Sequence, residues 1–206
     1  MIPFNTLRLI LILFPFLILW IVPAYGLDPA PPPTPSQKEV QILTDRDYVG
    51  VLIDRMDEAR SEILISMYLF KTDHSRGNPV NHIEQALENA AKRGVKIKIL
   101  LEREEGPKSE LNQYNEETAK KLQGSGMEVS FDSPRRRTHT KVIVVDRRYL
   151  FVGSHNFTRS ALQNNHEISI LIDSGEIAEQ TAAYIEKLIR ESKRKSAWDF
   201  FSDLFR

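Results

Sequence analysis

Helix-like and strand-like patterns alternate along residues 45–131, and this alternation constrains the fold more than any other feature of the sequence. Apolar residues recur at helical spacing in three segments, and short apolar runs such as EILISMYLF follow them. The helices are expected over 45–60, 78–93 and 116–123, and the strands over 62–70, 95–102 and 127–131. Such alternation predicts one α/β domain with a mixed, mostly parallel sheet and helices on both faces.

The pattern changes after residue 131. HTKVIVVD (139–146) and YLFVGS (149–154) predict a hairpin, which one more strand (166–173) and a final amphipathic helix (174–193) follow. The charged segment 103–115 contains Gly-Pro and is expected to be a loop, either a lid that contacts substrate or a solvated connector. The amphipathic tail, residues 196–206, is expected to pack on the domain, or else to contact a membrane surface or a partner.

The N-terminal segment has the order of a secretory signal. Arg8 precedes an apolar run (9–22), and the small residues of PAYG follow it. The run is shorter than the roughly 18 to 20 residues that a comfortable membrane span needs. Residues 1–26 are therefore expected to export the protein, either as a cleaved signal peptide of a periplasmic or secreted protein or as an uncleaved membrane anchor. The Pro-rich residues 27–38 are expected to form an extended linker, and the folded domain to span 39–195.

Composition excludes several kinds of chemistry. The chain has no cysteine, which removes thiol nucleophiles, disulfides and cysteine-based zinc sites. The 28 basic and 28 acidic residues give a formal net charge of zero. Bulk electrostatic attraction therefore cannot be the main way in which this protein binds a polyanion, and any anion site has to be local.

The predicted hairpin gathers four polar side chains that suit a phosphate group. His139 and Lys141 are two residues apart on one strand, so alternation should place them on the same face. Across the hairpin, Ser154 and Asn156 have the same spacing and should also share one face. These groups offer positive charge and hydrogen-bond donors without a cluster of carboxylates, which favours a tetrahedral oxyanion over a divalent cation. No metal and no cofactor are expected at this site.

The imidazole of His139 is the natural nucleophile of such a set. Its Nε2 can attack phosphorus if Glu167, on the next strand, holds the Nδ1 proton, and the product is a phosphohistidine that water resolves. Lys141 and Asn156 would stabilise the charge that develops on the phosphate oxygens. Taken singly, each of these residues could be structural, since a lone strand histidine usually is.

A zinc site formed by His139, His155 and His166 is a less favoured alternative. His155 should point to the face opposite Ser154 and Asn156, which argues against it.

Two sequence motifs resemble those of a known family. HTKVIVVD resembles the H-x-K-x4-D signature of the phospholipase D superfamily, and GSHN with the acidic residue downstream resembles its G-S-x-N continuation. The resemblance implies a phospholipase D-like fold and a phosphodiesterase that acts without metal through a phosphohistidine. It implies a catalytic set of His139, Lys141, Asp146 and Glu167, with Lys141, Ser154 and Asn156 as phosphate ligands. In this family Asp146 would be more structural than chemical.

The mechanism that the resemblance implies needs two histidines, one that attacks and one that protonates the leaving oxygen. No second H-x-K is present in the chain. The simplest solution is a homodimer in which the two copies of His139 face each other across a shared site. Because it carries a single motif, the chain is similar to small exported bacterial endonucleases of the family, and also to mitochondrial cardiolipin hydrolases.

The substrate class is open at the level of sequence. Arg135, Arg136 and Arg137 directly precede the strand of the expected nucleophile and could contact a phosphate backbone, although they could equally be a solvated charge run. A non-specific endonuclease on DNA or RNA is the favoured prediction. The alternative is phospholipase D-type hydrolysis of a phospholipid such as cardiolipin at a membrane. A third possibility is a nucleic-acid or anionic-lipid binding protein without turnover.

Overall fold

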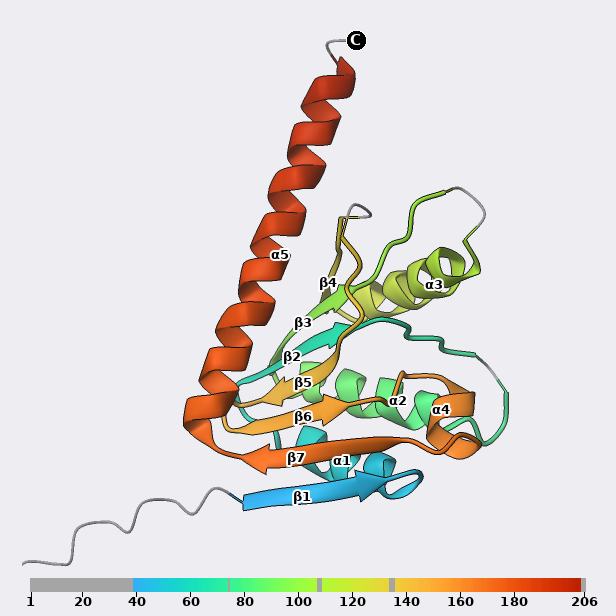
Figure 1. The fold of residues 1–206 in the computed structure, drawn as a ribbon, viewed down its shortest axis with the longest axis vertical. Helices are drawn as coiled ribbons and strands as arrows, with labels where there is room; N and C mark the ends of the chain where they lie inside the picture. Colours follow the sequence, from blue (N-terminus) through green and yellow to red (C-terminus); the bar gives the residue numbers. More distant parts are fainter. Residues whose placement is uncertain (1–38, 74, 107–108, 134–135, 205–206) are drawn as a thin grey trace, which may run out of the picture. The chain divides into compact units, whose positions relative to one another are not determined.

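A computed structural model describes residues 39–73, 75–106, 109–133 and 136–204 (Figure 1). The predicted leader (1–26), the linker (27–38) and Arg135 lie outside these residues, as do the side chains beyond residue 194. The described part forms one compact unit. Its elements are β1 (Glu39–Thr44), α1 (Asp47–Glu58), β2 (Glu62–Met67), α2 (Pro79–Lys92), β3 (Lys96–Leu101), α3 (Glu110–Gly124), β4 (Glu128–Phe131), β5 (Lys141–Val145), β6 (Tyr149–Gly153), α4 (Arg159–Gln163), β7 (Ile168–Asp173) and α5 (Gly175–Leu204).

The seven strands form one mixed sheet with the order β1-β7-β6-β5-β2-β3-β4. The prediction of a mixed α/β domain is confirmed, but the expectation that most pairings are parallel is wrong. Only β2–β3 and β3–β4 are parallel, whereas β1–β7, β2–β5, β5–β6 and β6–β7 are antiparallel. A parallel pair needs a long crossover between its strands, and the turn of residues 146–148 between β5 and β6 is far too short for one.

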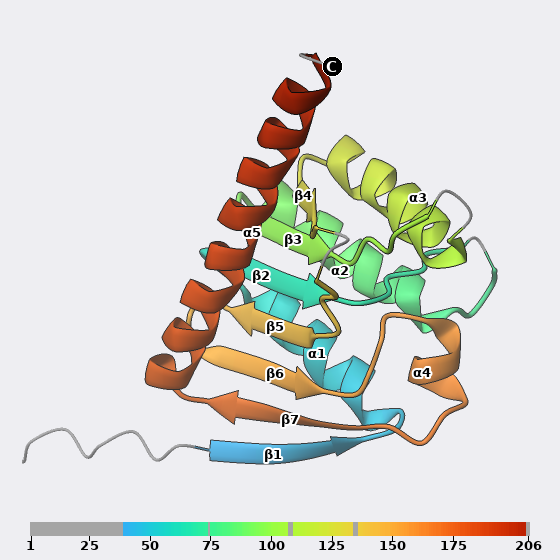
Figure 2. The same cartoon turned by 45° about the horizontal axis from the view of Figure 1, so that its top comes forward.

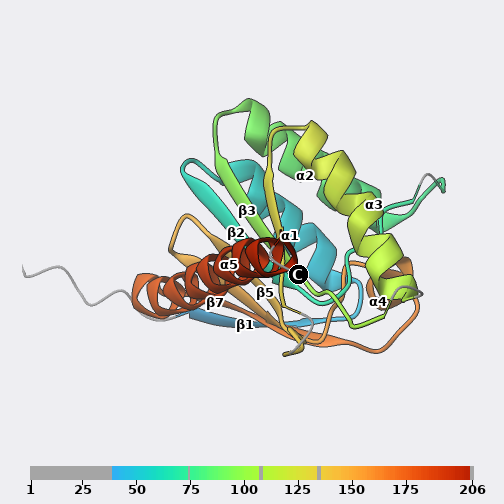
Figure 3. The same ribbon diagram turned by 90° about the horizontal axis from the view of Figure 1, so that it is seen from above.

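Helices cover both faces of the sheet, as predicted (Figures 2 and 3). The larger core packs α1, α2 and α3 on one face, through residues such as Leu52, Ile83 and Leu122, all of which are fully buried. The smaller core packs α5 on the other face, where Ala182 and Ile185 meet the outward side chains of the central strands. None of the helices in the described residues is both long enough and apolar enough to cross a membrane.

Two helix boundaries differ from the sequence prediction. Helix α3 begins at Glu110 instead of residue 116, because Ser109 caps it by accepting a hydrogen bond from the Asn112 backbone N–H at 3.2 Å. The loop expected over 103–115 is correspondingly shorter. Helix α5 continues past residue 193 to Leu204, since neither glycine nor proline interrupts residues 176–204. The short strand β1 and the short helix α4 were not predicted.

Candidate functional site

The site residues gather at one end of the central strands of the sheet. Strand β5 begins at this end, and its neighbours β2 and β6, which run antiparallel to it, end there. Val142 pairs with Val152, so residues 139–141 lie beside residues 153–155. Strand β7 also begins at this end, because Ser169 pairs with Gly153. The topology therefore brings the His139 segment, the Ser154 segment and Glu167 together.

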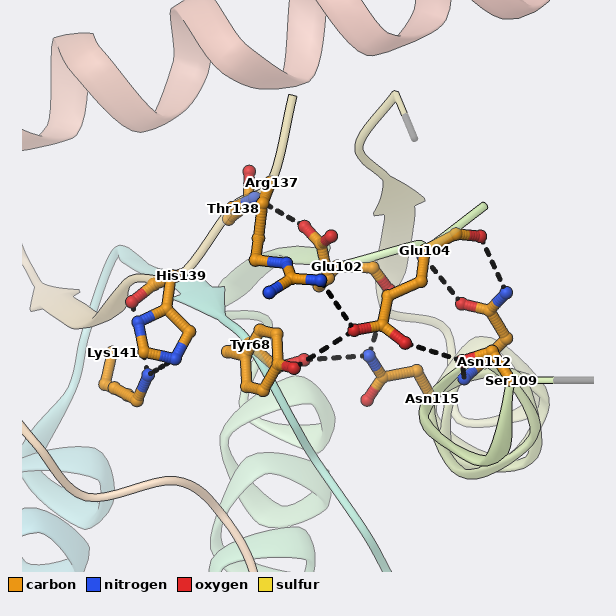
Figure 4. Close-up of polar contacts among 10 residues, drawn as sticks. All are labelled: Tyr68, Glu102, Glu104, Ser109, Asn112, Asn115, Arg137, Thr138, His139 and Lys141. Atoms are coloured by element: carbon orange, nitrogen blue, oxygen red, sulfur yellow. Dashed lines mark hydrogen bonds and ion pairs between the residues drawn. The ribbon is translucent and has the colours of Figure 1, made fainter. Parts of the chain in front are cut away.

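His139 and Lys141 are neighbours, as the spacing predicted (Figure 4). The Lys141 Nζ lies 3.2 Å from Nε2 of His139 and donates a second hydrogen bond, also of 3.2 Å, to the His139 carbonyl oxygen. His139 is exposed as a residue, although the Tyr68 ring covers part of its imidazole, whereas Lys141 is buried. His139 precedes β5 instead of belonging to it. Because an ammonium group can only donate, the Nε2 atom accepts and the proton of a neutral imidazole is assigned to Nδ1.

The electrostatic environment favours the neutral form of this imidazole. Partial burial, and then the charges of Lys141 and Arg137, lower the pKa of His139 below its usual value. Burial also lowers the pKa of Lys141, and the negative charge of Glu167 opposes this effect. A neutral imidazole, in which one ring nitrogen carries no proton, is the form that can act as a nucleophile.

The backbone just before His139 is fixed by two carboxylates that the sequence analysis missed. Glu102 accepts a short hydrogen bond from the Thr138 backbone N–H, and Asp132 accepts one from the Thr138 hydroxyl. All three side chains are buried. Each carboxylate stands directly after an apolar strand, a position at which a charged residue could have been recognised as a site candidate. Burial raises the pKa of Glu102, and the Thr138 hydrogen bond acts in the opposite direction.

Glu167 is beside the site, but its carboxylate is held by groups other than His139. Ser154 donates a short hydrogen bond to Oε2, and the Asn165 side-chain amide donates to Oε1 at 3.0 Å. The Ser154 hydroxyl also accepts from the Ile168 backbone N–H at 3.1 Å. Ser154 was predicted to be a phosphate ligand and Glu167 to be the partner of His139. In the structure, these two side chains are hydrogen-bonded to each other.

Asn156 has a buried side-chain oxygen without a hydrogen-bond partner, one of four such buried polar atoms among the described residues. Buried polar groups are nearly always paired in native proteins, so an unpaired one requires an explanation. An amide oxygen can only accept a hydrogen bond, so this atom suits a donor and not a phosphate oxygen. Contact with a phosphate group would have to be made by the side-chain N–H groups of Asn156.

Asp146 directly follows β5, at the end of the strand opposite to Lys141. Its carboxylate accepts hydrogen bonds from the backbone N–H groups of Arg60, Ser61 and Glu62 at 2.9, 2.8 and 3.1 Å, and from the Ser61 hydroxyl at 2.8 Å. This places Asp146 away from the other members of the catalytic set. It joins the end of β5 to the start of β2, which is the structural role that the resemblance implied.

His155 is a structural residue in the core. Its Nε2 atom lies 3.0 Å from the Asp45 carbonyl oxygen, its Nδ1 atom lies 2.7 Å from the Ser169 hydroxyl, and its ring stacks on Tyr48 with 4.2 Å between centroids. Because both ring nitrogens are engaged, His155 cannot join His139 and His166 around a zinc ion. No three histidine, aspartate or glutamate side chains in the described part of the chain are arranged to hold a metal.

The arginines before His139 are only partly free to meet a substrate. The guanidinium of Arg137 forms an ion pair of 3.2 Å with Glu104, although its side chain remains 61% exposed (Figure 4). Arg136 is exposed. A phosphate group that approached Arg137 would have to compete with the Glu104 carboxylate.

The fold and the site define a class of protein, namely an α/β domain that presents a histidine–lysine pair and an asparagine at one end of the central strands of a mixed sheet. The family described as "Cardiolipin synthase, PLD-like domain" matches residues 52–189, which is more than half of the chain. The chain therefore belongs to this phospholipase D-like family.

Individual relatives carry different names. A phospholipase D of Rickettsia bellii is 32% identical over 143 residues, which cover 69% of this chain and 63% of the relative. The mouse mitochondrial cardiolipin hydrolase is 22% identical over 173 residues, or 84% of this chain and 68% of the relative. Among solved structures, the phospholipase D family member Nuc of Salmonella typhimurium has a TM-score of 0.62 and 26% identity, with 74% of this chain and 94% of Nuc covered. The chain thus spans less than two thirds of the length of the Rickettsia bellii relative.

Proposed function

We propose that this protein hydrolyses phosphodiesters without a metal ion, with His139 as the nucleophile. The observation that carries the proposal is the distance of 3.2 Å between Lys141 Nζ and His139 Nε2. A non-bridging phosphate oxygen that binds the ammonium group brings phosphorus next to the attacking nitrogen. The same charge then stabilises the phosphoryl oxygens as negative charge develops on them.

The reaction has two steps. Nε2 of His139 forms a bond to phosphorus while the bond to the leaving oxygen breaks, and a second imidazolium group protonates that oxygen. A water molecule, deprotonated by the second imidazole, then attacks phosphorus and breaks the nitrogen–phosphorus bond. The products are an alcohol and a phosphomonoester, and both imidazoles regain their original protonation states.

The second imidazole is proposed to come from another copy of the chain. His155 is buried with both nitrogens engaged, and no other histidine has a lysine two residues after it. A two-fold homodimer brings His139 of a second copy to the same phosphate. Sedimentation of the active protein should therefore show a dimer, and a fully active monomer would contradict this assignment.

A non-specific endonuclease acting on DNA or RNA is the favoured activity. The similarity to Nuc covers 94% of that protein, and the exposed Arg136 and Arg137 lie close to the nucleophile in the chain, separated from it by Thr138. Arg136 suits contacts with the phosphates that flank the scissile bond, and Arg137 can make such a contact by exchanging Glu104 for a phosphate.

Hydrolysis of a phospholipid is the alternative, and the phospholipase D relatives favour it. The chemistry of the site is the same for both substrates. Attachment to a membrane through residues 1–26, or export after their cleavage, belongs to the proposal as well, and fractionation of cells that express the full chain would test it.

The deciding experiment compares plasmid DNA, single-stranded RNA and cardiolipin-containing vesicles as substrates, each in the presence of EDTA. His139→Ala should abolish turnover and leave binding intact, whereas His82→Ala, an exposed histidine on α2, is the matched control and should behave like the wild type. Cleavage of vesicles alone would favour the phospholipid alternative. Loss of all activity in EDTA, or full activity of His139→Ala, would refute the mechanism.

A further inference from the structure

Tyr68, which follows β2, contacts both members of the histidine–lysine pair. Its ring meets the His139 ring edge to face, with 4.6 Å between centroids and an interplanar angle of 67°. The Lys141 ammonium lies 5.0 Å from the centroid of the same ring. Figure 4 shows the tyrosine between the pair and helix α3. The aromatic ring therefore forms one wall of the site.

The backbone of Tyr68 is fixed on both sides. Its N–H donates to the Thr140 carbonyl oxygen at 2.9 Å, and its carbonyl oxygen accepts from the Asn115 side-chain amide at 3.0 Å. Asn115 is fully buried on α3 and also accepts from the Phe70 backbone N–H at 2.9 Å. The backbone of Tyr68 thus cannot shift without breaking these hydrogen bonds.

The other end of Tyr68 is held by Glu104. The phenol hydroxyl donates to Glu104 Oε1 at 3.2 Å. Glu104 is itself anchored at the start of α3, because its Oε2 accepts from the Ser109 hydroxyl at 2.9 Å and its backbone N–H and carbonyl oxygen both bond to the Asn112 side chain at 2.9 Å. A side chain fixed at both ends presents its ring in one orientation.

We propose that Tyr68 is a positioning residue for His139 and that Glu104 acts through it, holding the ring against the imidazole so that Nε2 stays directed at Lys141. This inference rests on the proposed role of His139 as nucleophile. His139 stands outside the strand and is exposed, so its ring needs a neighbour to limit its rotation. A displacement of the reacting nitrogen by about 1 Å can reduce a rate by about 100-fold.

The ring contact also contributes to the protonation state of His139. Burial is the largest cause of the lowered pKa of this histidine, and Tyr68 supplies part of that burial. Removal of the ring should let water reach the imidazole and raise its pKa towards the usual value. If Tyr68 served only the stability of the sheet and did not cover the imidazole, its removal would leave this titration unchanged.

The test compares Tyr68→Leu, which loses the ring, with Tyr68→Phe, which keeps it. Tyr68→Leu should reduce kcat by about 10- to 100-fold, while KM changes by less than about twofold. Tyr68→Phe, which keeps the ring but loses the hydrogen bond to Glu104, should recover only part of the loss. Tyr184→Leu, which changes a half-exposed tyrosine on α5, is the control and should match the wild type. Tyr68→Leu with unchanged kcat would overturn the proposal.

A double-mutant cycle tests the link to Glu104. If Glu104 acts through the phenol hydroxyl, Tyr68→Phe combined with Glu104→Ala should lower kcat no more than Glu104→Ala alone. Fully additive effects would refute this link.

An NMR titration of His139 in the full 206-residue chain separates this inference from the proposed function, because it needs no turnover. His139→Ala identifies the resonance. If the wild type cleaved none of the three substrates, the proposed function would fail, and the titration would still decide the role of Tyr68. The titration midpoint should rise in Tyr68→Leu and remain near the wild-type value in Tyr68→Phe. An unchanged midpoint in Tyr68→Leu would count against the positioning role.

Discussion

Gly153→Ala should destabilise the protein strongly, because the end of β6 lies against the backbone of β7. A Cβ atom built on Gly153 would lie 2.4 Å from the Ser169 Cα, 2.5 Å from the Ile168 carbonyl oxygen and within 2.1 Å of the Ser169 hydroxyl oxygen. Overpacking usually costs about 1 to 3 kcal/mol, and the upper end applies here because two of these three atoms belong to a paired strand. For a domain of this size, about 3 kcal/mol lowers the melting temperature by roughly 6 to 12 °C.

The assay is urea denaturation followed by circular dichroism, with Gly50→Ala as the matched control. Gly50 lies in α1, and a Cβ built on it meets nothing within 4 Å. An alanine there should stabilise the helix by about 0.5 to 1 kcal/mol. Ser169→Ala should not rescue Gly153→Ala, since the backbone contacts remain. Equal stabilities of Gly153→Ala and the wild type would refute the close approach of the two strands.

Three further outcomes are expected from the titratable groups. Burial raises the pKa of Asp146, but its four hydrogen bonds more than offset this effect, so the net pKa lies below its usual value. In urea denaturation, Asp146→Asn should therefore lower the free energy of unfolding by about 2 kcal/mol at pH 7 and by much less below pH 4. Burial lowers the pKa of His155, so the stability of the wild type should fall as the pH drops below about 6.5, and His155→Phe should show a shallower decline over the same range. If two copies of His139 share the site as proposed, one must be neutral and one protonated, and because the pKa of His139 is lowered, kcat/KM should peak below about pH 6.5. An optimum well above pH 7 would contradict the last expectation.

The sequence predicted the elements better than their pairing. Apolar periodicity located α1, β2, α2 and β3 to within a few residues, because each buries one clear stripe or run. Strand direction depends on the connections between strands, and the alternation of helices with strands in the first half of the domain suggested more parallel pairs than exist. Strand β1 escaped prediction because its apolar residues Val40 and Ile42 are exposed at the edge of the sheet instead of marking a buried face.

The candidate site shows the same division between local pattern and tertiary contact. The motif spacing correctly predicted that His139 and Lys141 are neighbours. It could not reveal Tyr68, which lies more than 70 residues earlier and reaches the site only because β2 pairs with β5. Such contacts depend on the strand order, which no short motif encodes.

The location of His139 outside the strand explains why so many polar groups surround it. A residue inside β5 would be held by the ladder hydrogen bonds, whereas His139 precedes the ladder. Its position is fixed instead by Thr138, which is bound to two buried carboxylates, and by Thr140, whose carbonyl oxygen accepts from the Tyr68 backbone. Buried carboxylates are costly unless they are hydrogen-bonded, so Glu102 and Asp132 stabilise this one path of the backbone and disfavour others. Substitution of either carboxylate should therefore disturb the orientation of the imidazole more than it disturbs the sheet.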